Sequence, residues 1–165
     1  MNRISRIIGL VSISFLVMII TGCTNKQAIA TEVIAGVQKD VPFTIIVPSY
    51  FPKDVKVIPI GISGPSISDI TKSVGVGITY YGNSPDKTII IDEENIEITM
   101  WPNGPSETFN VNGVAVLSQT TTMGSATKIT HGFLYSWNRD GVNFQVRLFG
   151  YNQTEGKKIV ESMIK

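Results

Sequence analysis

Cysteine and histidine are almost absent from this sequence, which contains one of each, Cys23 and His131. A lone cysteine excludes a disulfide within the chain, so the folded state must depend on a hydrophobic core. A metal cluster of cysteine and histidine ligands is excluded for the same reason. No serine lies in a Gly-x-Ser-x-Gly elbow that could use His131 as a base. The sequence therefore predicts no catalytic residue, no metal site and no cofactor.

An excess of either charge is also lacking. The chain has 14 lysine and arginine residues against 13 aspartate and glutamate residues, a formal net charge of +1. Loss of Arg3 and Arg6 with an N-terminal leader would leave 12 against 13, a net charge of −1. The lysines are scattered along the chain. This pattern excludes the basic surface of a nucleic-acid-binding protein and a polybasic patch for anionic lipids.

Long hydrophobic runs are limited to one, over residues 7–20. Its 14 residues fall short of the roughly 20 that a bilayer-spanning helix needs. Arg3 and Arg6 precede it without any acidic residue. A positively charged start followed by a short apolar run is typical of a secretory signal. We therefore expect residues 1–22 to be a cleaved signal peptide and not a transmembrane helix.

The apolar run ends in Ile20-Thr21-Gly22-Cys23, which resembles the lipobox of bacterial lipoproteins. The resemblance implies cleavage after Gly22 and a diacylglycerol thioether on Cys23. Two or three acyl chains such as palmitate would then hold the protein firmly on a membrane. Thr24 replaces the aspartate of a known retention signal. We expect a lipid-anchored extracytoplasmic protein in the cell membrane or the outer membrane.

Three regions are expected along the chain. The signal peptide over residues 1–22 is followed by the lipidated cysteine and a tether over residues 23–40. Apolar residues from Ile29 to Val37 allow one short amphipathic helix in this tether. The folded domain is expected over residues 41–165, a length sufficient for one domain with a hydrophobic core.

Period-two patterns and turn signals predict that this domain is mostly β. A loop is expected over 61–73, and the acidic run 92–94 is expected to be a solvated turn, because it lacks the spacing of a calcium-binding loop. Asn152 and Glu155 resemble a capping box before an amphipathic C-terminal helix. The predicted fold is α+β, an antiparallel sheet packed by that helix. The expected strands are 43–47, 55–60, 74–81, 88–91, 96–101, 108–111, 114–122, 129–137 and 142–149.

The C-terminal half contains a Trp-x-x-x-Gly-x-x-Phe hairpin from Trp137 to Phe144, preceded by an Asn112-Gly113 turn. With the closing helix, it resembles an uncharacterised bacterial envelope domain related in shape to the lipoprotein-carrier and periplasmic sigma-regulator folds. The resemblance implies that Trp137 and Gly141 are core and hairpin residues. In carriers of that shape, a curved sheet covered by helices holds acyl chains.

Aromatic residues are the remaining candidates for a binding site. Four of them could line a groove for an apolar, glycan or peptide ligand: Tyr81, Trp101, Tyr135 and Trp137. The alternative is that they pack the core. We predict a non-enzymatic binding or sensing module whose partners are the membrane, through Cys23, and an envelope protein, glycan or lipid. An alternative is a lipid- or lipopeptide-handling protein with an apolar groove between sheet and helix; a hydrolase is less expected.

Overall fold

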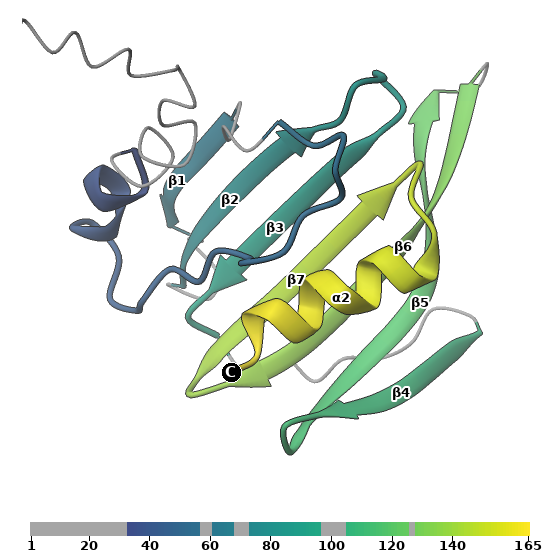
Figure 1. Cartoon of the computed structure of the whole chain (residues 1–165). Helices are drawn as coiled ribbons and strands as arrows, with labels where there is room; N and C mark the ends of the chain where they lie inside the picture. Colours follow the sequence, from purple (N-terminus) through teal and green to yellow (C-terminus); the bar gives the residue numbers. More distant parts are fainter. Residues whose placement is uncertain (1–32, 57–60, 68–72, 97–104, 126–127) are drawn as a thin grey trace, which may run out of the picture.

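The computed structural model describes residues 33–56, 61–67, 73–96, 105–125 and 128–165. Within them, seven antiparallel strands form one sheet in the order β1-β2-β3-β7-β6-β5-β4, and helix α2 (Gln153–Met163) lies across one face (Figure 1). This confirms the expected mostly antiparallel α+β fold. The expected signal peptide and Cys23 lie outside the described residues. The strands are β1 Gly61–Ile67, β2 Val74–Tyr81, β3 Thr88–Glu94, β4 Ser106–Val111, β5 Val114–Ser125, β6 Lys128–Arg139 and β7 Val142–Phe149.

The sheet joins two runs of sequential strands through β7. β1, β2 and β3 pair in order, and so do β4, β5, β6 and β7. β7 then pairs with β3, so that Val146 lies opposite Ile91. The last strand of the sequence therefore lies in the middle of the sheet.

The two faces of the sheet differ in polarity, as strand alternation requires. One face carries the apolar core, which includes Ile78, Ile91, Val146 and Tyr135 in one row across four strands. The other face carries polar, half-exposed side chains such as Gln145. Antiparallel sheets commonly bury one face only.

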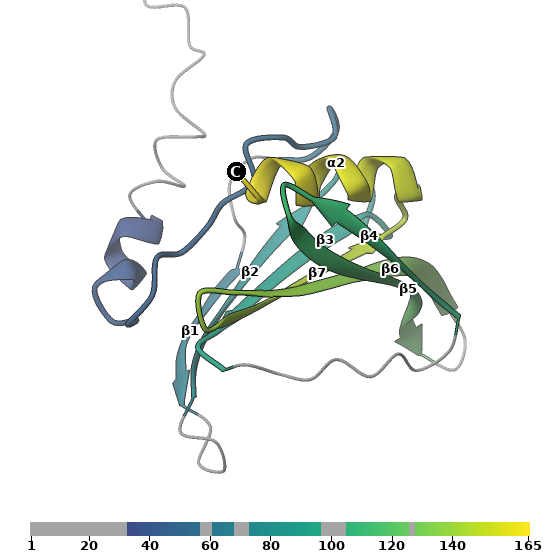
Figure 2. The same cartoon turned by 90° about the horizontal axis from the view of Figure 1, so that it is seen from below.

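Helix α2 covers the apolar face (Figure 2). The Asn152 side chain accepts a hydrogen bond from the Glu155 backbone N–H at 2.9 Å, which confirms the predicted N-cap. A Cβ at Gly156 would lie 2.5 Å from the Tyr135 side chain, so only glycine allows the helix to approach this closely. The predicted apolar stripe of the helix is buried in the core: Ile159, Val160, Met163 and Ile164.

The expected strand over 43–47 is wrong. Residues 41–56, here called the covering segment, run without regular structure over the apolar face of the sheet (Figure 1). Val41, Ile45 and Val55 are buried in the core, and the Phe51 and Tyr80 rings lie 4.7 Å apart. The segment is extended and apolar as expected, but it packs through side chains and not through a backbone ladder. Val55 and Lys56 of the expected second strand belong to this segment, and 57–60 lie outside the described residues.

Two other expectations are also wrong. Residues 61–67 form strand β1 and not a loop, because a backbone ladder with β2 does not require an apolar sequence. The acidic residues 92–94 continue strand β3 and are not a solvated turn. The expected strand at 96–101 falls mostly outside the described residues. A short helix is present at 33–38, within the expected tether.

Candidate functional site

The structure does not bring the four predicted groove aromatics together. Tyr135 and Trp137 are fully buried, and Trp137 stacks on Phe144 with ring centroids 5.1 Å apart. Tyr81 is exposed at the end of β2, and Trp101 lies outside the described residues. The burial of Tyr135 and Trp137 fits core packing, the alternative interpretation of these residues.

The three acidic residues of β3 point to alternate sides of the sheet. Asp92 forms a hydrogen-bonded ion pair with Arg147 of β7 on the polar face. Glu94 accepts a hydrogen bond from the Ser73 hydroxyl. Glu93 points into the core and is 0% exposed. The described residues contain no group of three or more histidine, cysteine or acidic side chains that could hold a metal ion.

Glu93 fastens the covering segment to the sheet. Both of its carboxylate oxygens lie 3.1 Å from the backbone nitrogen of Ile46, which donates to them. Burial raises the pKa of Glu93 to about 8, although the Ile46 N–H opposes the shift. The pKa of Tyr80 is also raised, mainly by burial and partly by the charge of Glu93. These two groups lie inside the fold, where they serve packing and not an open site.

The polar face carries a row of hydrogen-bonded side chains across β6 and β7. The Asn143 amide donates to Asn138 at 3.1 Å, and the Gln145 amide donates to Asn143 at 3.4 Å. The covering segment and α2 both pack on the opposite, apolar face (Figure 2). The polar row therefore holds neighbouring strands together on the side of the sheet away from α2.

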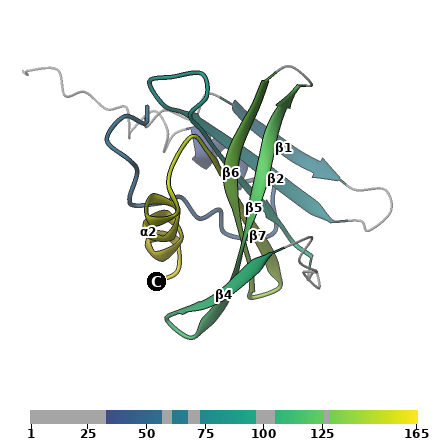
Figure 3. The same ribbon diagram turned by 90° about the vertical axis from the view of Figure 1, so that its right-hand side faces the viewer.

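Figure 3 shows that β5 extends beyond the end of β4. A hollow of about 450 Å³ is lined by this part of β5 and by β6. Its lining residues alternate between the two sheet faces, so it wraps around the strand. They are Gln119, Thr120, Thr121, Thr122, His131 and Leu134. A smaller hollow of about 260 Å³ lies between β4 and the start of α2, lined in part by Glu107, Phe133 and Gln153.

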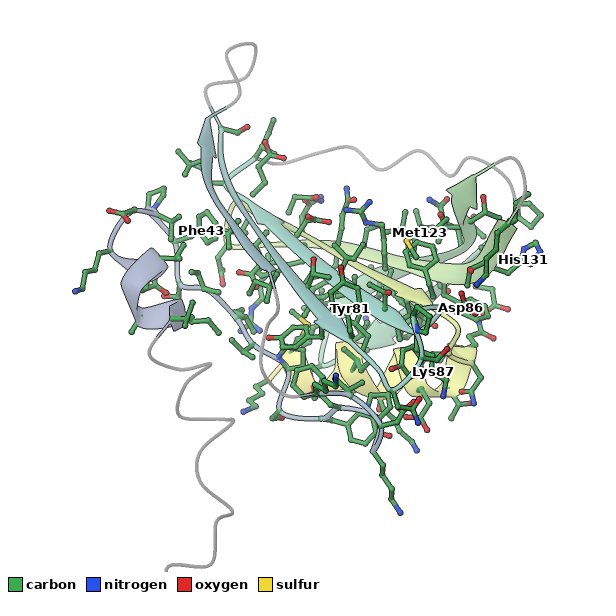
Figure 4. The ribbon with its side chains drawn as sticks, turned by 90° about the horizontal axis from the view of Figure 1, so that it is seen from above. Phe43, Tyr81, Asp86, Lys87, Met123 and His131 are labelled. Atoms are coloured by element: carbon green, nitrogen blue, oxygen red, sulfur yellow. The ribbon has the colours of Figure 1, made fainter. Side chains whose placement is uncertain are left out.

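The first of these hollows is the candidate functional site. Figure 4 shows His131, one of its lining residues, near Met123 at the opposite end of the domain from Phe43 of the covering segment. His131 is exposed there, opposite Thr122 of β5. Sequence reasoning missed this site. The signal that could have found it is the absence of charge and proline from Val114 to Ser125.

Comparison with known proteins identifies no relative: no family model, curated protein or solved structure matches the chain. Every helix in the described part of the chain is too short or too polar to cross a membrane.

Proposed function

We propose that this protein is a membrane-anchored extracytoplasmic lipoprotein whose folded domain is a non-enzymatic binding module. The lipobox-like sequence ending at Cys23 supports the anchor. The signal peptide over residues 1–22 and the tether over 23–40 belong to the same proposal. The domain over residues 41–165 would be held beside the membrane and present its surface to a partner in the envelope.

Side chains fill the space between α2 and the sheet, and this packing is why we propose a surface-binding module and not a lipid carrier. Ile159, Val160 and Met163 of the helix and Tyr135 and Trp137 of the sheet are each at most 3% exposed. Gly156 leaves no room for even a methyl group against Tyr135. An acyl chain needs an apolar cavity of several hundred Å³, and the packing here favours binding on the outside of the domain instead.

The charged side chains of the domain support a non-enzymatic role. Asp92 pairs with Arg147, Asp54 with Lys87, and Asp86 with Lys128. Each pair joins different segments of the chain. The three aspartates, which could otherwise act as acids or bases, are thereby engaged in contacts between segments of the fold.

The anchor is tested by Cys23→Ser in the native host. We expect the variant to lose acyl chains and to leave the membrane fraction, or to remain unprocessed with its leader attached. Thr24→Ser is the matched control and should be processed and anchored like the unchanged protein. A Cys23→Ser variant that is fully processed and stays on the membrane would contradict the lipobox interpretation.

The binding mode is tested by native mass spectrometry of the detergent-extracted protein. The expected mass is that of the chain with its covalent acyl groups alone. A lipid retained in one-to-one amount after detergent exchange would instead support the lipid-handling alternative, because it would require an apolar cavity.

A further inference from the structure

Half of strand β5 lacks a neighbour on its outer side among the described residues. β5 has 12 residues and β4 has six, and their ladder ends where Ser106 lies opposite Gln119. Among the described residues, Thr120 and the residues of β5 that follow it pair with β6 alone. The sheet therefore has a step at its margin, in line with β4, where one more strand could lie (Figure 1).

The turn between β4 and β5 determines which backbone groups point into this step. Asn112 and Gly113 both have positive φ, 48° and 86°, as in a two-residue type I′ hairpin. Val111 and Val114 therefore exchange both of their backbone hydrogen bonds, and every second residue of β5 faces the β4 side. This alternation directs the N–H and C=O of Thr120 and Thr122 outward. Thr121 and Met123 instead bond to β6.

The other margins of the sheet carry features that discourage strand pairing. β1 contains Pro65, which has no N–H, and its register shifts between Ser63 and Ser66. β4 is short and carries the charged residue Glu107. Charges, prolines and irregular register are the means by which proteins protect sheet edges. The free part of β5 contains no charged residue and no proline, and its register with β6 is regular from Leu117 to Ser125.

The side chains at the step suit an uncharged strand. Thr120, Thr122 and His131 are exposed on one side of it, and Leu134 and Thr121 are half-buried on the other. Ile129, 60% exposed, adds an apolar side chain on the same side as His131. Threonine side chains can hydrogen-bond to threonine or serine on a neighbouring strand. A segment with alternating threonine and valine would match both sides.

We propose that this step binds an extended, uncharged segment of a partner protein, which adds to the sheet as a strand beside Thr120 and Thr122. The proposal names the partner class of the binding module proposed above and rests on it for the role of the surface. Backbone hydrogen bonds to the two threonines would supply most of the recognition, and the hollow around β5 would receive alternate side chains of the segment.

A second copy of this chain fits the step less well. If β5 paired antiparallel with itself about Thr122, Ser125 of the second copy would lie opposite Gln119. Ser106 of β4 already occupies that position. A separate peptide segment has free ends and avoids this overlap.

The test uses a capped seven-residue peptide of alternating threonine and valine with the isotope-labelled full chain in detergent micelles. Amide hydrogen exchange is measured by NMR. In the free protein, the Thr120 and Thr122 amides should exchange at least tenfold faster than those of Thr121 and Met123. At saturating peptide, exchange of Thr120 and Thr122 should slow at least tenfold, and a peptide with its three central amides N-methylated should have no effect.

Two matched variants locate the binding. Thr122→Pro removes an outward N–H without touching the β6 ladder, so it should fold and lose the effect of the peptide. Thr108→Pro removes an outward N–H in the same way on the outer side of β4. This variant should still show slower exchange when the peptide is added. The proposal is overturned if free Thr120 and Thr122 are already protected, if the N-methylated peptide acts equally, or if both variants respond alike. None of these outcomes depends on the anchor, which the Cys23→Ser experiment tests separately.

Discussion

Glu93 and Ile46, 47 residues apart in sequence, are joined by hydrogen bonds from the Ile46 N–H to both carboxylate oxygens, each at 3.1 Å. Glu93 is fully buried, and its neighbours across the sheet are Val76 of β2 and Phe144 of β7. A buried carboxyl without a cationic partner is stable mainly in its protonated form. The contact therefore makes attachment of the covering segment dependent on pH.

The first prediction concerns the pH dependence of stability. Burial raises the pKa of Glu93 to about 8 in the folded state, from its ordinary value of 4.5. Between these two pH values, the folded protein keeps a proton on Glu93 that the unfolded chain releases. The free energy of unfolding should fall as pH rises from about 4.5 to 8 and level off above, by a total on the order of 5 kcal/mol. Urea unfolding at a series of pH values measures this slope.

Glu93→Gln should remove most of that slope, because the amide is neutral throughout and its oxygen can still accept from Ile46. Above pH 8, this variant should be more stable than the unchanged protein. Glu94→Gln is the matched control; Glu94 is half-exposed, and its variant should keep the slope. If Glu93→Gln retained the full slope, another group would have to be responsible for it.

A second prediction concerns the attachment of the covering segment itself. Glu93→Ala removes the acceptor of the Ile46 N–H. The variant would therefore have an unpaired amide and a cavity in the core. We expect a loss of about 2–4 kcal/mol in the free energy of unfolding, and faster hydrogen exchange at Ile46 than at amides of β7. Equal acceleration at all amides would instead mean that the whole domain opens as one unit.

Two helical glycines give a third prediction. A Cβ added at Gly156 would clash with the Tyr135 side chain, whereas a Cβ added at Gly36 would have no atom within 4 Å. Gly156→Ala should lower the free energy of unfolding by about 1–3 kcal/mol, because the helix must move away from the sheet. Gly36→Ala should be neutral or raise it by up to about 1 kcal/mol through helix propensity. Similar effects in the two variants would show that propensity, and not packing, dominates at Gly156.

The N-cap of α2 gives a fourth prediction. Asn152→Ala removes the acceptor of the Glu155 N–H and should lower the free energy of unfolding by about 1 kcal/mol. Asn152→Asp keeps the acceptor and should stay within a few tenths of a kcal/mol of the unchanged protein. Thermal unfolding of the three proteins compares them directly. An Asp variant as unstable as the Ala variant would contradict a capping role.

The parts of the fold that were correctly predicted are those in which a local pattern determines the structure. Polar and apolar residues alternate over most of β2 and β7, the Asn112-Gly113 turn sets the β4–β5 hairpin, and Asn152 caps α2. Residues 43–47 of the covering segment are expected to form a strand, because an apolar β-branched run has the same sequence whether it joins a ladder or lies across a sheet. Pro42 and Pro48, which flank this run, are compatible with both arrangements.

The candidate site could not be predicted, because it depends on relationships between distant elements. That β4 stops opposite Gln119 follows from strand register and not from any motif. The burial of Glu93 requires Ile46 and the covering segment above it. Tyr135 and Trp137 could equally have faced a groove, and only the position of α2 decides that they do not.

The central position of β7 also constrains when the domain can acquire its structure. β3 and β6 both use β7 as a neighbour, so before residues 142–149 are in place each exposes a complete strand edge. During synthesis, before residues 142–149 are available, the preceding strands would form two separate meanders with unpaired edges. Residues 142–149 join them, and residues 153–163 then cover the shared apolar face. Completion of the sheet is thus delayed until residues 142–149 have been synthesised, although the six other strands precede them in the sequence.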